Sequence, residues 1–597
     1  MTGLTTGSLW QRLQSGKAAD FLVLPGRTVS YADCAGEVRR WVQQFDNLGL
    51  REGDRVLIRT ASESAAVSCF VAALLDGLVP VMLTPDTPDI SAAAVLGTVE
   101  AACLVADEGA WQLPLPAATC HVSLSEVVRT GRSWLGKRAK ADFLGGVSEQ
   151  PASRSPRLPA SDAGLAYILF TSGTTSSPSG VMLTRANVFA NLATLSRLFG
   201  YDQQSRIFND MILAHADGFI QGPLLALANG CAVIRSGGFR LPELEQWLNR
   251  VRQQRATHVI TVPTIWAMID SYAAHDDYFD APECRALLSV AARLPDPLWQ
   301  KIESRFKRPV FNQYGLTETV ASALYAGPAP EMGAFGTIGR PVDCEARIDP
   351  LSATPGEGEL HLRGDNIFAG YWANETRTRA SFTDDGWMKT GDLARLRPDG
   401  SYAMLGRMKS VIMMGGFLIR PDEIDEAMQA HPSVRESVTL GIADDLFEEV
   451  PVTAVVCDPP LDEVALTEHA RTRLSGQKVP KRIVALDAIP RGISGKPNLS
   501  ALRDILTMEL GAQHSVGGDD EDLLGTVLAI AADVFRVSPA LLSPQSATGD
   551  VPGWDSFSQL NFILAVERHF DVEIPVARMA SMKSIADVVR AVGDLIA

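Results

Sequence analysis

The sequence predicts an α/β protein with a large N-terminal core, a smaller α+β domain and a C-terminal helical module. Over roughly the first 400 residues, short apolar runs alternate with stretches of helical periodicity, which is typical of buried strands covered by helices. The next segment has strand and helix signals of its own, and helical spacing returns after a Gly- and Asp-rich stretch. We therefore expect a core over 1–405, an α+β domain over 406–507, a linker over 508–518 and a helical module over 519–597.

Composition excludes several classes of protein. The 597 residues include 54 Lys and Arg against 70 Asp and Glu, a formal net charge of −16, so the chain offers no general surface for phosphate backbones and no nucleic-acid partner is expected. A hydrophobic share of 46% supplies a sizeable core and excludes global disorder. No apolar run approaches the ~20 residues of a spanning helix, and the first 15 residues do not read as a secretory signal, so no membrane association is expected.

The eight cysteines are scattered singly, without a Cys-x-x-Cys pair or clustered histidines. This pattern predicts free buried thiols in a reducing compartment, hence a cytoplasmic protein, rather than disulfides or a structural zinc site.

The apolar runs of the core are the expected buried strands: Arg55–Ile58, Val79–Leu83, Leu165–Phe170 and His258–Val262. A β-rich patch follows from Glu357 onward, where an Asp-Gly turn at 399–400 precedes another short run. The module over 519–597 has 12 acidic and 5 basic residues, and its helices are expected from the spacing of Leu523, Val527 and Ile530 and of later apolar residues.

The first segment with chemical potential is Thr171–Gly180, placed between a buried strand and a helix expected to begin near Thr184. Hydroxyls and backbone N–H groups on such a loop can wrap phosphate oxygens. It lacks the Gly-Lys-Ser/Thr ending of a P-loop, and by itself it could equally be a polar surface turn. The candidate phosphate-binding residues are Thr171, Ser172, Gly173, Thr174 and Thr175.

A second segment, Asn312–Glu318, supplies complementary groups. A tyrosine ring can stack on a nucleobase, a threonine can hold a phosphate, and a carboxylate can hold Mg²⁺ against it. Further on, Asp392 could take ribose hydroxyls and Arg407 could add a donor. Each of these pieces alone is more often a turn or a surface ion pair.

In this order, the segments resemble the adenylate-forming superfamily, which includes acyl-CoA synthetases, luciferases and the adenylation domains of nonribosomal peptide synthetases. The resemblance covers about residues 20–505. It also rests on Gly336–Pro341, Gly370–Trp372, Gly386–Asp392, Gly406–Lys409, Gly415–Phe417 and Ser494–Lys496. It implies a large multi-layer adenylation core and a small mobile α+β C-terminal subdomain, with ATP between them.

The resemblance also implies roles for single residues. Tyr314 would stack on adenine, Thr317 would contact the α-phosphate, and Glu318 would bind Mg²⁺. Asp392 and Arg407 would hold the ribose. The remaining nucleotide contacts would come from the Thr171–Thr175 segment together with Asn312 and Gly315.

The C-terminal subdomain would contribute the mobile part of the machinery. Lys496 would reach the carboxylate and α-phosphate oxygens, where its charge offsets the charge of the transition state. Lys409 would be the hinge between two orientations of the subdomain, and Gly415 and Gly416 would line the pantetheine path.

Two departures from the family pattern stand out. The phosphate loop of the family usually ends Gly-x-Pro-Lys-Gly, whereas here Ser176 and Ser179 replace the glycine and the lysine, so one pyrophosphate-directed charge is missing. The segment Ser289–Arg293 also lacks the small Gly-Gly or Gly-Ala pair that usually flanks the adenine and acyl pockets.

The module near the C-terminus resembles acyl or peptidyl carrier proteins, which are four-helix bundles. Their Asp-Ser-Leu signature here reads Asp555-Ser556-Phe557. The resemblance implies that Ser556 carries 4′-phosphopantetheine, and a helix N-terminus suits the added phosphodiester. The alternative is that Ser556 is an ordinary N-cap.

Together these features predict an ATP- and Mg²⁺-dependent acid–thiol ligase that activates a carboxylic acid and loads it onto its own carrier. The expected partners are a phosphopantetheinyl transferase and downstream assembly-line or tailoring enzymes. His215, Asp217 and Gly218 are the candidate substrate residues: Asp217 would pair with the ammonium of an amino acid, whereas His215-x-x-Gly218 resembles simple acyl-CoA ligases. The alternatives left open are a fatty or aryl acid ligase acting on a carrier or CoA, and a degenerate scaffold without activity.

Overall fold

The computed structural model describes most of the chain. Its described residues are 3–128, 141–145, 154–171, 179–351, 355–414, 417–444, 448–457, 463–474, 478–491, 497–511, 523–535, 537–547, 551, 554, 556–570, 572, 574, 578 and 582–596. The chain divides into two compact units, Met1–Leu405 and Gly406–Ala597.

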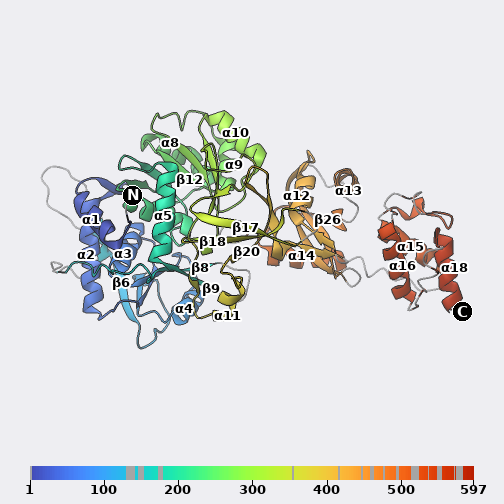
Figure 1. Cartoon of the computed structure of the whole chain (residues 1–597), viewed down its shortest axis with the longest axis horizontal. Helices are drawn as coiled ribbons and strands as arrows, with labels where there is room; N and C mark the ends of the chain where they lie inside the picture. Colours follow the sequence, from blue (N-terminus) through green and yellow to red (C-terminus); the bar gives the residue numbers. More distant parts are fainter. Residues whose placement is uncertain are drawn as a thin grey trace. The chain divides into compact units, whose positions relative to one another are not determined.

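A nine-stranded sheet, of which Figure 1 labels β12, belongs to the first unit. Its strand order is β16-β15-β14-β13-β12-β10-β11-β1-β2. Its strands are β1 (Asp20–Leu24), β2 (Arg27–Ser30), β10 (Arg206–Asn209), β11 (Ala232–Ile234), β12 (His258–Thr261), β13 (Ala286–Ser289), β14 (Val310–Tyr314), β15 (Leu324–Ala326) and β16 (Arg340–Pro341). Neighbours from β1 to β14 are parallel. The carboxyl ends of β10, β12, β13 and β14 therefore meet along one edge, where open α/β sheets place their ligands.

The second sheet of this unit has eight strands in the order β19-β9-β8-β4-β3-β5-β6-β7. Its strands are β3 (Arg55–Arg59), β4 (Val79–Met82), β5 (Cys103–Asp107), β6 (Cys120–Val128), β7 (Ala141–Gly145), β8 (Leu165–Thr171), β9 (Ser179–Thr184) and β19 (Gly370–Tyr371). The expected runs at 55, 79, 165 and 258 are all strands, which confirms the α/β class.

The helix expected near Thr184 is present as α5 (Arg185–Phe199), but a strand that was not expected, β9, lies between it and the hydroxyl-rich segment after β8. Strand β9 pairs antiparallel with β8, with Thr171 opposite Ser179, so the segment joins two strands rather than a strand and a helix. Val181 and Leu183 are fully buried, and this alternation makes β9 a strand with one face in the core. The expected helix, α5 (Arg185–Phe199), begins only after Thr184, which caps it by accepting a hydrogen bond from the Asn187 N–H.

Helices cover both faces of both sheets. On β3, Val56 and Ile58 belong to the core shared with the central helices, whereas Leu57 packs in the cluster that includes α4 residues. On β10, Ile207 faces the central helices and Phe208 packs with α8, α9 and α10. The central helices are α1 (Thr6–Ser15), α2 (Tyr31–Asn47), α3 (Glu63–Leu75), α5 and α7 (Leu225–Asn229), and the outer helices are α4 (Asp89–Thr98), α8 (Leu244–Gln253), α9 (Pro263–Tyr272) and α10 (Asp296–Phe306).

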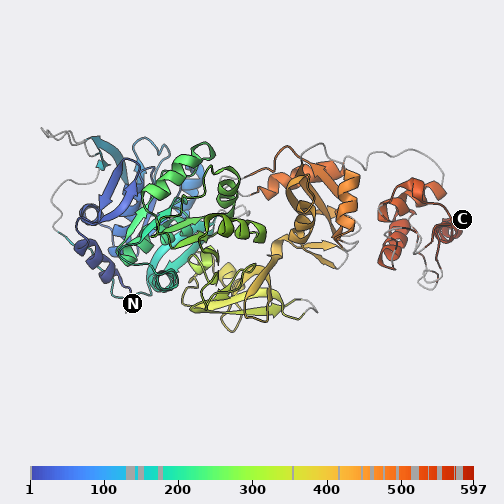
Figure 2. The same ribbon diagram turned by 90° about the horizontal axis from the view of Figure 1, so that it is seen from above.

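A four-stranded antiparallel sheet completes the first unit and includes the expected β-rich patch. It is drawn in yellow in Figure 2, and its order is β17-β18-β20-β21. The strands are β17 (Cys344–Pro350), β18 (Glu357–Gly364), β20 (Met388–Leu396) and β21 (Tyr402–Arg407). The short helix α11 (Glu375–Ala380) follows β19.

The first part of the second unit is a small α+β domain around one sheet. Its elements are β22 (Ile412–Met414), β23 (Phe417–Ile419), α12 (Pro421–Gln429), β24 (Val434–Asp444), β25 (Glu448–Cys457), α13 (Glu463–Arg471), β26 (Arg482–Ala485) and α14 (Leu499–Gly511). Helix α14 continues to Gly511, so the expectation that a linker begins at 508 is wrong. Leu502 and Leu506 anchor this helix in the core, and it ends at a glycine.

The last part of the chain forms a helical module with its own core. Its elements are α15 (Leu523–Phe535), a 3-10 turn (Pro539–Leu541), α16 (Ser556–Phe570) and α18 (Ile585–Ile596). Trp554 is buried and its ring stacks on Phe535 at 4.3 Å between centroids, with Phe562 edge-on to both rings. The four-helix bundle of a carrier protein stays a prediction.

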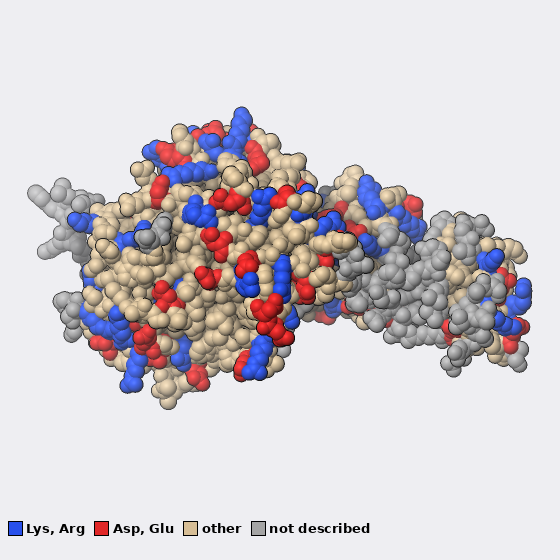
Figure 3. Space-filling model, in the orientation of Figure 1, with Lys and Arg blue, Asp and Glu red and all other residues tan. Residues whose placement is uncertain are grey.

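The face drawn in Figure 3 shows acidic and basic side chains interspersed over the first unit. Among the described residues, no helix has the length and apolar character needed to cross a bilayer.

Candidate active site

Tyr314 and Asp392 are brought together at the carboxyl end of β14. Tyr314 is the last residue of that strand, and its hydroxyl donates a hydrogen bond to Oδ2 of Asp392 at 2.6 Å. Asp392 is fully buried and Tyr314 is 9% exposed. The sequence predicted that both residues hold one nucleoside, and the fold places them within hydrogen-bonding distance.

A turn inside β20 positions Asp392. Gly391 adopts φ +70°, a left-handed conformation that favours glycine, and its N–H donates to Oε1 of Glu359 at 2.9 Å. The Thr390 hydroxyl donates to the Leu360 carbonyl at 2.6 Å and accepts the Asp392 N–H at 3.1 Å. Neighbouring strand β18 therefore fixes the backbone on which the Asp392 carboxylate stands.

The segment after β14 turns sharply. At Gly315 a Cβ atom would lie 2.0 Å from the carbonyl oxygen of Ala321, so this position admits no side chain. Thr317–Thr319 form one 3-10 turn, which ends at Val320 with φ +69° and ψ −70°. The Ala321 N–H closes a γ-turn around Val320 by donating to the Thr319 carbonyl at 2.9 Å. A β-branched residue in this conformation is strained, and such strain concentrates at functional sites.

Glu318 lies on this turn and accepts a hydrogen bond from the Tyr371 hydroxyl at 2.7 Å. Burial, followed by the charge of Glu318, raises the pKa of Tyr371 above its usual value. The phenol therefore stays protonated and keeps one oxygen of the Glu318 carboxylate oriented. Tyr371 belongs to the Gly370–Trp372 segment of the resemblance, but the sequence predicted no role for it, because its partner Glu318 stands 53 positions away.

The side chain of Asn312, two residues before Tyr314 on β14, is buried. It is 3% exposed, and its Nδ2 donates to the Thr337 carbonyl at 3.2 Å. Its buried Oδ1 has no hydrogen-bond partner among the described residues.

Two further sequence-based expectations fall on described residues. Ala291 adopts φ +66° in the segment where the family usually has a glycine, so this alanine takes up a conformation that favours glycine. Arg407 is the exposed last residue of β21, which neighbours β20 in the four-stranded sheet.

Several predicted residues lie outside the described part of the chain, and their roles stay predictions. These are Ser172, Gly173, Thr174, Thr175, Gly415, Gly416 and Lys496. For Thr171, Lys409 and Ser556 only the backbone is described: they lie at the end of β8, in a 3-10 turn and at the start of α16.

The predicted substrate residues lie at the start of α6 (Ala216–Phe219), where His215 is the N-cap residue. Oδ1 of Asp217 accepts a hydrogen bond from Nε2 of Gln221 at 2.8 Å. A Cβ at Gly218 would lie 2.1 Å from the Ile212 carbonyl oxygen, so close packing accounts for this glycine.

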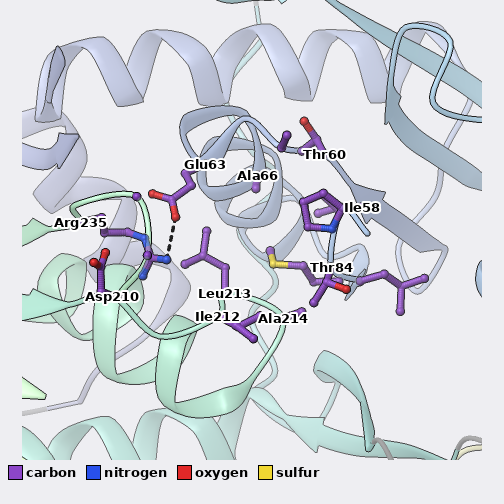
Figure 4. Close-up of a pocket in the computed structure, with 16 residues that line it drawn as sticks. Ile58, Thr60, Glu63, Ala66, Thr84, Asp210, Ile212, Leu213, Ala214 and Arg235 are labelled. Atoms are coloured by element: carbon purple, nitrogen blue, oxygen red, sulfur yellow. Dashed lines mark hydrogen bonds and ion pairs between the residues drawn. The ribbon is translucent and has the colours of Figure 1, made fainter. Parts of the chain in front are cut away.

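A pocket of about 220 Å³ lies where β3 and β4 end against the segments that follow β10 and β11 (Figure 4). Its apolar wall includes Met82 and Leu213, and its polar side holds Glu63, Asp210 and Arg235. Arg235 is 3% exposed and forms an ion pair with Glu63 at 2.7 Å. Residues Ile212 to Ala214 line the pocket, but none of the three predicted substrate residues does. The sequence did not predict this pocket. The available signal was the carboxyl ends of the predicted strands, where open α/β sheets place their ligands.

One other group could hold a metal. Single ligand atoms of Asp349, Glu359 and His361 lie within 4.8 Å of one another on β17 and β18. Glu318, the predicted Mg²⁺ ligand, is not part of this group.

Comparisons with known proteins identify the chain as an enzyme of the adenylate-forming class. The ATP-bound structure of MatB from Rhodopseudomonas palustris superimposes with a TM-score of 0.73 at 22% identity, covering 84% of this chain and 99% of that chain. The "AMP-binding enzyme" family model matches residues 9–372, and the "AMP-binding enzyme C-terminal domain" model matches residues 423–496. The chain belongs to the AMP-binding enzyme family.

Similar curated proteins include CoA ligases and a synthase, and the matches cover different shares of these proteins. Sulfoacetate–CoA ligase of Cupriavidus necator is 35% identical over 349 residues, which are 57% of this chain and 67% of that protein. 2-Succinylbenzoate–CoA ligase of Bacillus subtilis is 27% identical over 509 residues, 84% of this chain and 98% of that protein. Naringenin synthase of Pestalotiopsis fici is 27% identical over 575 residues, 90% of this chain and 20% of that protein. Several of the matches cover only about two thirds of the relative.

Proposed function

We propose that this protein activates a carboxylic acid with ATP and transfers the acyl group to a thiol. The observation that carries the proposal is the buried Tyr314–Asp392 hydrogen bond of 2.6 Å at the carboxyl end of β14, with Glu318 on the next turn. The end of β14 would thus present an aromatic ring and a carboxylate for Mg²⁺, and β20 of the four-stranded sheet would add the Asp392 carboxylate as a ribose acceptor.

The residues fit a magnesium nucleotide. Mg²⁺ prefers oxygen ligands, and the Glu318 carboxylate is already oriented by Tyr371. When bound, Mg²⁺ would neutralise phosphate charge. Tyr314 would lie against the adenine, Asn312 would contribute its buried amide to the same side, and Asp392 with Arg407 would accept and donate hydrogen bonds at the ribose.

The chemical step is nucleophilic attack of the acid's carboxylate on the α-phosphorus. Thr317 would bind an α-phosphate oxygen, and Lys496 would offset the charge that builds up on the phosphate and carboxylate oxygens. A preorganised charge of this kind stabilises the transition state more than the ground state. The residues between Thr171 and Ser179 would surround the other phosphates.

The proposed thiol acceptor is the phosphopantetheine arm on Ser556, which would supply a flexible thiol. Helix α16 begins at Ser556, and a helix N-terminus favours a phosphodiester. The match to naringenin synthase covers 90% of this chain, which is more than residues 1–507 could supply, so the similarity reaches beyond the α+β domain. Tethering would give the carrier an effective concentration of order mM. The hinge of the domain movement would be Lys409. The pantetheine path would be lined by Gly415 and Gly416.

Free CoA is the second candidate acceptor. It is favoured by the names of the curated relatives, which are CoA ligases for sulfoacetate, oxalate and 2-succinylbenzoate. In that case Ser556 would not take part in the reaction.

The proposed substrate is an amino acid whose ammonium faces Asp217, with a simple carboxylic acid as the alternative. A half-buried carboxylate held by a neutral amide, as Asp217 is by Gln221, can accept a cation. The same relatives favour the simple acid, because their names specify acids without an amino group.

Pyrophosphate exchange tests the proposal directly. The full chain is incubated with ATP, Mg²⁺, labelled pyrophosphate and one acid at a time from a panel of amino acids and short carboxylic acids. Exchange above background for at least one acid supports the proposal, and its absence for all, despite intact folding, contradicts it. Adding CoA to a Ser556→Ala variant then separates the two acceptors, because only the CoA ligase would still form a thioester.

A further inference from the structure

Arg377 contacts Ser179 at the start of β9. Ser179 is the residue that stands where the family's phosphate loop usually carries a lysine. Nη1 of Arg377 donates a hydrogen bond to Oγ of Ser179. Arg377 lies on the short helix α11, which follows β19, and β19 pairs with β9. The guanidinium therefore reaches Ser179 through sheet pairing between segments almost 200 residues apart in sequence.

The Arg377 guanidinium is also linked, through Tyr371, to Glu318, the predicted Mg²⁺ ligand. It lies over the ring of Tyr371, 4.0 Å from the ring centroid, and the Tyr371 hydroxyl donates to Glu318. A continuous chain of contacts thus links the start of β9 to the turn that follows β14. Its members are Ser179, Arg377, Tyr371 and Glu318.

Arg377 is half-buried, and no carboxylate of the described residues lies within 4.0 Å of its guanidinium. By contrast Arg379, two positions further on the same helix, is exposed and paired with Glu375. A guanidinium has five N–H donors, and the contact with the Ser179 hydroxyl uses a neutral acceptor, so the cation retains donors and charge for an anion.

We propose that Arg377 contacts the β- and γ-phosphates of ATP and stabilises the departing pyrophosphate, taking over the charge that is absent at Ser179. This inference rests on the proposed function. In the reaction, a carboxylate oxygen of the acid bonds to the α-phosphorus while the bond from that phosphorus to the bridging oxygen breaks. The electron pair leaves with the pyrophosphate, whose growing negative charge faces the fixed guanidinium.

Arg377→Gln is the informative variant, because a glutamine amide can still donate to Ser179 but carries no charge. Calorimetry of the full chain would compare MgATP with AMP, which lacks the β- and γ-phosphates. We expect the affinity for MgATP to fall about ten- to hundredfold, as for loss of a hydrogen bond to a charged group, while the affinity for AMP stays within about twofold. Arg379→Gln is the matched control and should leave both affinities unchanged.

Adding Ser179→Lys to Arg377→Gln tests whether charge at this place is what matters. We expect the lysine to restore most of the affinity for MgATP, and Arg377→Lys alone to retain part of it. Unchanged MgATP binding in Arg377→Gln, a parallel loss of AMP binding, or no recovery with Ser179→Lys would each overturn the inference and assign Arg377 to holding β9 and Tyr371 in place. A wild-type chain that binds neither nucleotide would overturn the proposed function itself, and the inference with it.

Discussion

The Tyr314 hydroxyl and the Asp392 carboxylate form a 2.6 Å hydrogen bond between residues 78 positions apart in the chain. The bond joins the last residue of β14 in the nine-stranded sheet to the interior of β20 in the four-stranded sheet. Under the proposed function the ring would contact adenine and the carboxylate would contact the ribose, so the two residues should respond differently to mutation.

Tyr314→Phe keeps the ring and removes only the hydroxyl. We expect AMP affinity to change by less than about threefold and the free energy of unfolding to fall by about 1–3 kcal/mol, because a fully buried carboxylate loses a donor. Asp392→Ala should instead lower AMP affinity about ten- to hundredfold. Calorimetry and urea unfolding measure both effects, with exposed Asp384→Ala as the control. Equal losses of AMP affinity in the two variants would contradict these separate roles.

Lys496→Ala should slow acyl-adenylate formation by roughly 10²- to 10³-fold, the range seen when one preorganised donor to a transition state is removed. AMP affinity and thermal stability should stay near wild type, since the lysine acts on charge that develops only during reaction. Single-turnover kinetics with the best acid measures the effect, and exposed Lys389→Ala serves as the control. Adenylation within about threefold of wild type would reject Lys496 as the catalytic lysine.

Ser556→Ala should abolish modification by a phosphopantetheinyl transferase and CoA while leaving pyrophosphate exchange intact. Intact-protein mass spectrometry measures the modification, with Ser558→Ala as the control. We expect one added phosphopantetheine mass on wild type and on Ser558→Ala, and none on Ser556→Ala. Modification of the Ser556→Ala variant would place the attachment site elsewhere. No modification of wild type would favour the CoA ligase.

Asp217→Ala separates the two substrate classes. Losing one partner of a desolvated ion pair costs about 3–5 kcal/mol, so kcat/KM for an amino acid should fall at least about 10²-fold. The desamino analogue should be affected little or improve, because it leaves no unpaired charge. The quantity to measure is the ratio of the two rates in wild type and variant, and an unchanged ratio would leave the simple acid as the substrate.

Asp425 in α12 makes the stability of the second unit depend on pH. Burial raises its pKa to about 6, even though Ser437 and Thr439 donate hydrogen bonds to it. The folded chain therefore binds this proton more tightly than the unfolded chain. The protonated carboxyl contributes its full stability below about pH 4, and this contribution is lost as the pH rises through about 6.

Asp425→Asn keeps an acceptor oxygen and cannot ionise. At pH 8 the variant should be more stable than wild type by up to about 3 kcal/mol, and below about pH 4 the two should agree. Urea unfolding across this range, followed by a signal from the second unit, gives the comparison. A difference that does not vary with pH would show that ionisation of Asp425 is not its source.

Local patterns in the sequence were enough to predict the α/β class, because apolar runs such as His258–Val262 alternate with helical patterns, which favours buried strands between helices. Tyr314, Glu318 and Asp392 were nominated from the order of their segments, which resembles the adenylate-forming superfamily, since each segment alone is more often a turn or a surface ion pair. Of these, the structure joins Tyr314 to Asp392 directly.

Features that depend on pairing between strands far apart in the sequence could not be predicted from local patterns. Strand β9 looked like a loop leading to a helix, because a short run with two buried residues has too little periodicity to be recognised before its partners β8 and β19 are known. Arg377 and Tyr371 could not be nominated for the same reason: their relevance comes from the β19–β9 pairing, which no local spacing encodes. Helix α14 runs four residues past 507, to Gly511, because the last turn of a helix is marked less clearly in a sequence than its interior.

The close approaches at Gly218 and Gly315 limit which sequences this fold accepts. A Cβ atom at either position would lie 2.0 to 2.1 Å from a backbone carbonyl oxygen, which cannot move aside as a flexible side chain can. Among random variants that still fold, we therefore expect both positions to remain glycine. Tolerated changes should fall instead at residues such as Leu213 and Ala214, which line a pocket and can change size without moving the main chain.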